Sequence, residues 1–180
     1  MKNLKDIDIT DQKVLVRVDF NVPIDENGSI TDDIRITTAL PTIRYILEHK
    51  AKLILCSHMG RPKGERNLTY SLKVVAEHLS RLLDLNVQLA PDCIGDEVEE
   101  MVNSLENGQV ILLENLRFHK GETENDPDFS DALAALADVY INDAFAVSHR
   151  EHSSVVGVAS RISSKGAGFL LQKEMDYFHK

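Results

Sequence analysis

The chain has 180 residues, of which 43% are hydrophobic and 27% are charged, and its formal net charge is −9 at pH 7. This size fits one globular domain with a sizeable core. The acidic balance argues against a nucleic-acid-binding surface, because such surfaces depend on clustered basic residues. No apolar run approaches the roughly 18 residues that cross a bilayer, so no membrane partner is expected.

The amino terminus and the cysteines indicate the compartment. The first residues lack the apolar core of a signal peptide. The two cysteines, Cys56 and Cys93, stand in unrelated contexts without the spacing of a metal site. We therefore expect a reduced, cytoplasmic protein.

Five apolar runs predict strands buried on both faces of a sheet, and apolar residues at helical spacing alternate with them. The predicted strands are 14–18, 52–57, 87–90, 110–113 and 138–141. The predicted helices are 36–47, 71–83, 95–105, 126–137 and 169–180. This alternation indicates an α/β domain with a mostly parallel sheet and right-handed crossovers.

Local signals refine these elements. Asn27 and Gly28 predict a type I′ hairpin turn, and a calcium loop is disfavoured because the other oxygen ligands are not correctly spaced. Pro41 either kinks the first helix or marks its regular start. Three further positions are predicted helix caps: one of residues 31–33, then Ser71, and Asp126 before Pro127.

Polar and basic residues follow four of the five predicted strands. They are Asp19 and Asn21, His58 and Arg61, Arg117, and Asn142 leading towards Arg150. The carboxyl ends of parallel strands lie along one edge of the sheet, where open α/β folds bind ligands. Arg35, in the first helical turn, can join them. Because guanidinium groups bind phosphate and carboxylate through paired hydrogen bonds, we predict a site for a small, highly charged anion.

Each of these residues has a plainer interpretation. Taken alone, Arg117 or Arg150 is a solvated surface charge, His58 is a loop histidine, and Arg17 is a strand residue paired with an acid. His149 and His152 have the spacing of metal ligands, but no Cys or Glu completes a set, so no metal site is predicted. The repetition at successive strand ends favours the anion site. Neither GxxxxGK[ST] nor GxGxxG occurs, so no nucleotide-phosphate loop is predicted.

Four segments closely resemble phosphoglycerate kinase, and the resemblance covers essentially the whole chain. The segments are Arg17-Val18-Asp19-Phe20-Asn21-Val22-Pro23, Ser57-His58-Met59-Gly60-Arg61-Pro62-Lys63-Gly64, Leu113-Glu114-Asn115-Leu116-Arg117-Phe118 and Val139-Tyr140-Ile141-Asn142-Asp143-Ala144-Phe145. They correspond to the amino-terminal half of that family. The resemblance implies a Rossmann-like three-layer sandwich, which is one domain of a normally two-domain enzyme.

The family enzyme works in glycolysis and moves a phosphoryl group between 1,3-bisphosphoglycerate and ADP, giving 3-phosphoglycerate and ATP. The resemblance implies a substrate-binding set of Asp19, Phe20, Asn21, Arg35, His58, Met59, Gly60, Arg61, Arg117 and Arg150. Arg35 is also implied as the catalytic residue that reaches the transferring phosphoryl group. Arg17 and His149 are secondary candidates. Ala146 stands where many relatives have glycine, on the path to Arg150.

The resemblance also implies a division of labour. Residues 1–168 would form the 3-phosphoglycerate-binding domain, and residues 169–180 the start of a truncated interdomain helix. The missing carboxy-terminal domain would bind ADP or ATP with Mg²⁺, so no nucleotide or metal site is expected here. The fragment is expected to be inactive alone, and the full enzyme to be a monomer.

Two other hypotheses remain at this stage. The chain could be a free-standing module that binds small anions without kinase activity. It could also belong to a nucleotide-dependent oxidoreductase of similar layered fold, although the absent glycine fingerprint speaks against this.

Overall fold

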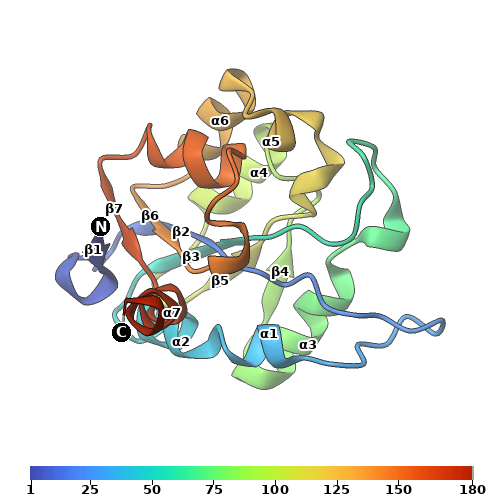
Figure 1. Cartoon of the computed structure of the whole chain (residues 1–180), viewed down its shortest axis with the longest axis horizontal. Coiled ribbons are helices and arrows are strands. Elements are labelled where there is room, and N and C mark those ends of the chain that lie inside the picture. The colour runs from blue at the N-terminus through green and yellow to red at the C-terminus, as the bar shows by residue number, and fades with distance from the viewer. Residues whose placement is uncertain (180) are drawn as a thin grey trace.

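The computed structural model describes residues 1–179 as a three-layer α/β domain with one central sheet (Figure 1). All pairings in this seven-stranded sheet are parallel, and the strand order is β1-β7-β6-β2-β3-β5-β4. The strands are β1 (Lys2–Asn3), β2 (Lys13–Arg17), β3 (Lys52–Cys56), β4 (Val87–Leu89), β5 (Val110–Leu112), β6 (Val139–Asn142) and β7 (Ser164–Ala167). The predicted α/β class and parallel sheet are confirmed.

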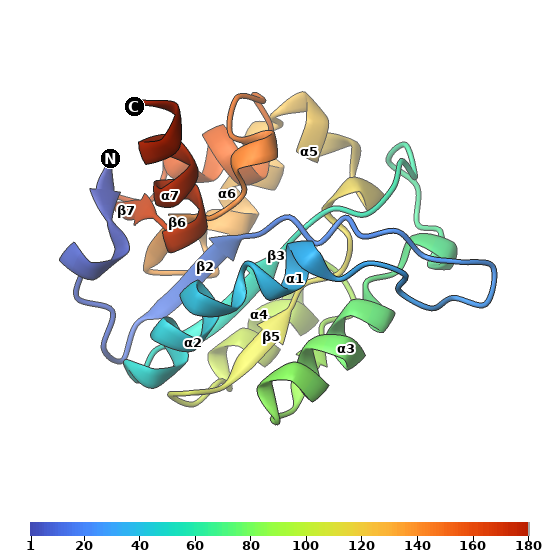
Figure 2. The ribbon, with the colours of Figure 1, turned by 60° about the horizontal axis from the view of Figure 1, so that its bottom comes forward.

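Helices cover both faces of the sheet (Figures 1 and 2). The helices are α1 (Ile34–Thr37), α2 (Leu40–Glu48), α3 (Lys73–Leu83), α4 (Asp96–Asn103), α5 (Lys120–Glu124), α6 (Pro127–Ala134) and α7 (Phe169–Phe178). One face carries α1, α2 and α3, and the other carries α4, α5 and α6. Helix α7 lies beside α2, where the Tyr45 and Phe169 rings meet edge to face at 5.2 Å. None of the helices in the described part is long and apolar enough to cross a membrane.

The core is divided between the two faces because successive side chains of a strand point in opposite directions. Val14 and Val16 of β2 pack with the α2–α3 side, whereas Leu15 between them packs with the α4–α6 side. In the neighbouring strand β3, Leu53 and Ile54 divide in the same way. Each strand is therefore buried on both faces, which explains its nearly continuous apolar sequence.

The edge formed by β1 and β7 was not predicted. Strand β1 has two residues, and β7 has the sequence Ser-Lys-Gly-Ala, so neither has an apolar run. Gly166 allows the two to pair, because a Cβ there would lie 2.6 Å from the Lys2 carbonyl oxygen. These two strands pair because their backbones can approach closely, and the spacing of apolar residues in the sequence gives no sign of that.

The hairpin after β2 exists, but its predicted turn type is wrong. Ile24 and Ile30 form an antiparallel bridge, and of the two turn residues only Gly28 has a positive φ, +79°. A type I′ turn requires positive φ at both central residues. The Asp25 carboxylate instead accepts the N–H groups of Asn27 and Ser29, each at 2.9 Å.

The predicted helix starts are confirmed in part. Asp33 is the cap residue of α1 but makes no side-chain capping hydrogen bond, and Leu72 rather than Ser71 is the cap residue of α3. Pro41 lies in the first turn of α2 and marks the start of the regular helix rather than a kink. The Asp126 side chain caps α6 by accepting from the Phe129 N–H at 2.9 Å. Ser71 lies just before α3 and accepts from the Lys73 N–H at 3.2 Å. Of the predicted helix 169–180, Lys180 lies outside the described residues.

Candidate functional site

Arg17, the last residue of β2, is completely buried at the carboxyl edge of the sheet. Its Nη2 donates to His58 Nδ1 at 2.8 Å, and its Nε donates to Ser154 Oγ at 2.9 Å. The Ser154 hydroxyl in turn donates to the buried Glu122 carboxylate at 2.6 Å. The expected acid partner of Arg17 is therefore reached through a serine, and the sequence pattern identified neither Ser154 nor Glu122.

His58, which follows β3, is held in one protonation state. Burial, followed by the charges of Arg17 and Arg117, lowers the pKa of His58 to about 2. The ring is therefore neutral at physiological pH. Because Arg17 can only donate, His58 Nδ1 must accept and the ring proton must lie on Nε2. The free edge of His58 thus offers one N–H donor.

The loop after His58 is clamped by Asn115, which follows β5. The Asn115 side chain accepts from the Met59 N–H at 3.2 Å and donates to the Met59 carbonyl oxygen at 2.7 Å. Gly60 adopts φ +61°, and a Cβ there would lie 2.5 Å from the Tyr70 ring. The Gly60 N–H donates to Asn21 Oδ1 at 3.0 Å. Hydrogen bonds thus join the loop after β3 to the segment that follows β2.

Arg117 lies half-buried after β5 and carries an unused donor. Its Nη1 donates to the Gly60 carbonyl oxygen at 3.4 Å, whereas its buried Nε has no hydrogen-bond partner among residues 1–179. Burial, followed by the charges of Arg17, Arg150 and, more weakly, Arg61, lowers the pKa of Arg117. Like charges disfavour one another, so the positive charges of Arg17, Arg150 and Arg61 around the Arg117 guanidinium favour an anion here. We call the four arginines Arg17, Arg61, Arg117 and Arg150, together with the neutral His58 that lies among them, the cationic cluster.

A hollow of about 440 Å³ opens beside this cluster, lined by Arg61, Lys63, Arg117, His119 and Lys120 among others. A second hollow of about 320 Å³ is lined by Asp19 and Arg35 among others, and it shares no lining residue with the first. Arg35 is exposed, and its Nη1 donates to the Asn21 carbonyl oxygen at 2.7 Å. Asp19 lies 3.5 Å from the same guanidinium. Of the predicted residues, Arg61 and Arg117 thus line one hollow, and Asp19 and Arg35 line another.

Three predicted residues are placed differently from the rest. The side chains of Phe20 and Met59 are buried in the core, so only their backbones can face a ligand. His149 stands over the Phe145 ring and lines a separate apolar hollow with Leu171 and Phe178. His152 lies nearer the cationic cluster: burial and, to a smaller extent, the charges of Arg117, Arg150 and Arg17 lower its pKa.

Asp143, which follows β6, was not singled out from the sequence. It is fully buried, and its Oδ1 accepts the Leu170 and Leu171 N–H groups of α7 at 3.0 and 3.1 Å. Burial raises the pKa of Asp143 to about 6. Because Asp143 also lines the hollow of Asp19 and Arg35, it connects that hollow to the start of α7.

Comparisons with known proteins agree on one family. The family model described as phosphoglycerate kinase matches residues 4–180. The phosphoglycerate kinase of Desulfotalea psychrophila is 62% identical over all of this chain and 46% of its own length. That of Geotalea uraniireducens is 54% identical over 96% of this chain and 43% of its own length. The chain thus spans about half the length of these relatives.

Solved structures give the same result. The phosphoglycerate kinase structure from Coxiella burnetii superposes with a TM-score of 0.87 at 39% identity, covering 97% of this chain and 43% of that one. The structure from Pyrococcus horikoshii OT3 superposes with a TM-score of 0.90 at 35% identity, covering 99% and 45%.

Proposed function

Since the chain belongs to the phosphoglycerate kinase family, we propose that it supplies the glycerate-binding part of an enzyme that transfers a phosphoryl group between 1,3-bisphosphoglycerate and ADP. In this proposal the cationic cluster binds the phosphate at the far end of the glycerate. The hollow of Asp19 and Arg35 takes the reacting end. The fully assembled enzyme acts as a cytoplasmic monomer in glycolysis.

The observation that carries this proposal is the buried Nε of Arg117. A buried donor without a partner costs free energy, and a phosphate oxygen would relieve that cost. The same oxygen would balance the charges that lower the pKa values of Arg117 and His58. A guanidinium prefers oxyanions that it can contact through parallel hydrogen bonds. A phosphate monoester fits this cluster better than a neutral ligand does.

Phosphoryl transfer demands positioning and charge stabilisation more than covalent chemistry from the protein. Neutral His58 can donate one hydrogen bond from its Nε2–H to the ligand, and it carries no proton on Nδ1. The Asn21 amide, whose oxygen accepts from the Gly60 N–H, is held in place and is assigned to a hydroxyl group of the ligand. Arg35 is tethered at its Nη1 but otherwise exposed, so its guanidinium can reach the transferring group. We therefore assign the catalytic role to Arg35.

The nucleotide and its Mg²⁺ are assigned to the other half of the family enzyme. No phosphate-cradling glycine motif occurs in this sequence, so in this proposal none of its residues binds the nucleotide or the magnesium ion. We propose that residues 1–180 alone do not transfer phosphoryl groups, because the two substrates must meet in a site closed by both halves.

The binding proposal is tested by titrating the chain with 3-phosphoglycerate in a calorimeter. Loss of one charged hydrogen-bonding group costs about 1.5–3 kcal/mol, so Arg117→Ala and Arg61→Ala should each weaken affinity about 10- to 100-fold. Arg44→Ala is the matched control, because Arg44 is exposed on α2 and bonds to the Leu82 carbonyl oxygen. Unchanged affinity in both cluster variants would show that the anion site is wrongly assigned.

Two further measurements separate the alternatives. Inorganic phosphate should bind more weakly than 3-phosphoglycerate; equal affinity would favour a general anion-binding module. A coupled assay with 1,3-bisphosphoglycerate and Mg·ADP should show no turnover by the chain alone, and measurable ATP production would overturn the assignment of catalysis to both halves.

A further inference from the structure

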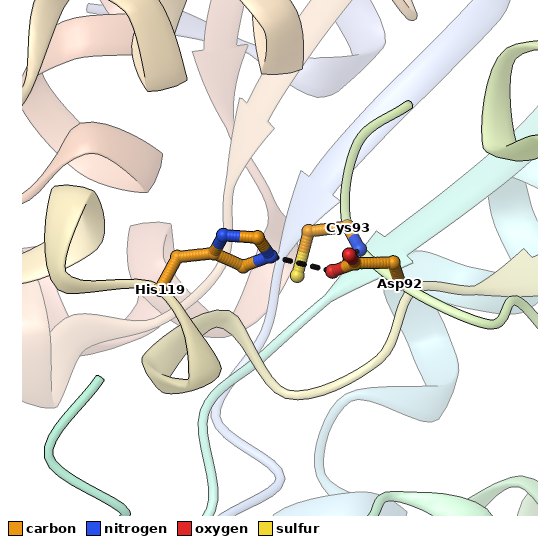
Figure 3. Close-up of side chains that lie close together, drawn as sticks. All are labelled: Asp92, Cys93 and His119. Atoms are coloured by element: carbon orange, nitrogen blue, oxygen red, sulfur yellow. Dashed lines mark hydrogen bonds and ion pairs between the residues drawn. The ribbon is translucent and has the colours of Figure 1, made fainter. Parts of the chain in front are cut away.

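Three side chains of metal-binding type meet beside the sheet. The proposed function gives none of them a role, although His119 also lines the hollow beside the cationic cluster. Figure 3 shows Asp92 and Cys93, from the loop after β4, facing His119, from the turn before α5. One ligand atom from each residue can be chosen so that all three lie within 4.8 Å of one another. His119 Nε2 and Asp92 Oδ1 are 2.5 Å apart, the contact drawn as a dashed line.

The backbone holds these residues in place. The Ala90 N–H donates to the Leu112 carbonyl oxygen at 2.8 Å, which continues the pairing of β4 and β5 up to the Asp92–Cys93 loop. The His119 ring stacks on Phe129 of α6 with the centroids 5.0 Å apart. The arrangement is therefore preorganised, and a ligand would not have to assemble it.

A catalytic cysteine would be the first alternative for a Cys–His–Asp group. Here the Cys93 thiol donates to the Glu114 carbonyl oxygen at 2.8 Å, and its side chain is completely buried. Burial, with smaller contributions from Asp92 and other nearby acidic groups, raises the pKa of Cys93 well above its ordinary value. A nucleophilic cysteine must instead be a readily formed, accessible thiolate. The hydrolase interpretation therefore fails.

We propose that Asp92, Cys93 and His119 form a binding site for Zn²⁺. Thiolate, imidazole and carboxylate are the three ligand types that zinc accepts in tetrahedral sites. The His119 and Asp92 side chains are 27% and 38% exposed, so water can reach a fourth position. Two anionic ligands balance the charge of the ion, which suits a site with a buried sulfur.

Proton balance on binding is straightforward. The ion displaces the Cys93 thiol proton, which leaves to solvent, and forms a bond to the sulfur. It replaces the hydrogen bond between His119 and Asp92: the Nε2 proton leaves to solvent, Nδ1 holds a proton taken from solvent so that the ring is neutral, and Nε2 offers its lone pair to the ion. Asp92 binds through its carboxylate and gains or loses no proton.

The chain contains a matched comparison for this site. His78 and Asp33 also form a histidine–carboxylate pair, 2.9 Å apart and 23% and 39% exposed, but no thiol accompanies them. Cys56 is a second free, buried cysteine without a histidine–carboxylate pair beside it. These residues control separately for the loss of an imidazole and the loss of a thiol.

The experiment is a Zn²⁺ titration of the reduced chain against a chromophoric chelator. We expect one equivalent to bind, and Cys93→Ala and His119→Gln each to weaken binding about tenfold or more. Cys56→Ala and His78→Gln should leave the affinity unchanged. Absence of stoichiometric binding, or equal loss in the control variants, would overturn the proposal.

A measurement without substitutions guards against variants that misfold. Co²⁺ added to the unsubstituted chain should produce a sulfur-to-cobalt charge-transfer band together with the visible bands of a tetrahedral site, and Zn²⁺ should abolish both. Cobalt spectra typical of oxygen ligands alone would show that Cys93 is not a ligand. The three residues would then be a buried thiol beside an ordinary loop-closing ion pair.

Discussion

Two regions at the carboxyl edge of the sheet bury charge in opposite ways. In the cationic cluster, Arg17 is fully buried and Arg117 half-buried, and no carboxylate of residues 1–179 lies within ion-pair distance of either. At the start of α7, the fully buried carboxylate Asp143 is held by backbone N–H groups. One region has positive charge in excess, and the other has a negative charge with one oxygen unpartnered among the described residues.

The difference shows how each region responds to protons and ligands. Burial, reinforced by the neighbouring positive charges, opposes protonation of His58, and the same charges favour an incoming anion, so the cationic cluster is suited to binding. Burial opposes ionisation of Asp143, so the start of α7 becomes more stable when that residue takes up a proton. Acid should therefore weaken the first region and strengthen the second.

The largest effect on stability should come from removing the negative charge of Glu122, which Arg17 of the cationic cluster contacts through Ser154. Glu122→Gln leaves buried Arg17 without a compensating charge, and disrupting a buried pair in this way costs about 3 kcal/mol or more. Urea unfolding at pH 7 measures this loss. Glu124→Gln, in the same helix but exposed, is the control and should change stability by less than about 0.5 kcal/mol. Similar losses of stability in both variants would show that the hydrogen-bond chain from Arg17 through Ser154 to Glu122 has no special stabilising role.

The second effect tests the acid response of the cationic cluster. Below pH 6.5 the unfolded state protonates His58, whereas the folded state, with its pKa near 2, does not. The stability that His58 contributes is therefore present above pH 6.5 and is lost as pH falls. Linkage predicts a loss of about 2 kcal/mol between pH 7 and pH 5, absent in His58→Asn. Equal pH dependence of the two proteins, measured by denaturant unfolding, would contradict the depressed pKa.

These two regions also show how far sequence reasoning extends. The strand ends were found because buried runs and their polar termini are local patterns, and parallel pairing brings them to one edge. Arg117 and His58 were predicted on that basis. Glu122 and Ser154 were not, because they are 32 residues apart and meet only when α5 packs against the segment Ser153–Gly157.

Other differences have similarly long-range causes. The choice between His149 and His152 depends on the backbone path after Phe145–Val147, and spacing alone gave no preference. Phe20 and Met59 belong to the motif but turn their side chains into the core. Cys93 and His119 have no metal-site spacing in the sequence, because β4 and the turn after β5 become neighbours only in the sheet.

The smallest effect concerns Asp143, and its sign is opposite. Its pKa rises from 3.8 in the unfolded state to about 6 in the folded state, so the stability that protonation provides is complete below pH 3.8 and is lost as pH rises through 6. Linkage predicts that the wild type loses on the order of 1 kcal/mol from this group between pH 5 and pH 8. Asp143→Asn cannot ionise and should remove that loss while its side-chain oxygen still accepts from Leu170.

Thermal unfolding of the His58→Asn protein with and without Asp143→Asn isolates the effect, because the larger, opposing pH dependence that His58 causes is then absent. If the stability of the two proteins depends on pH in the same way, the pKa of the Asp143 carboxylate is not raised, and the two regions do not respond to acid in opposite directions.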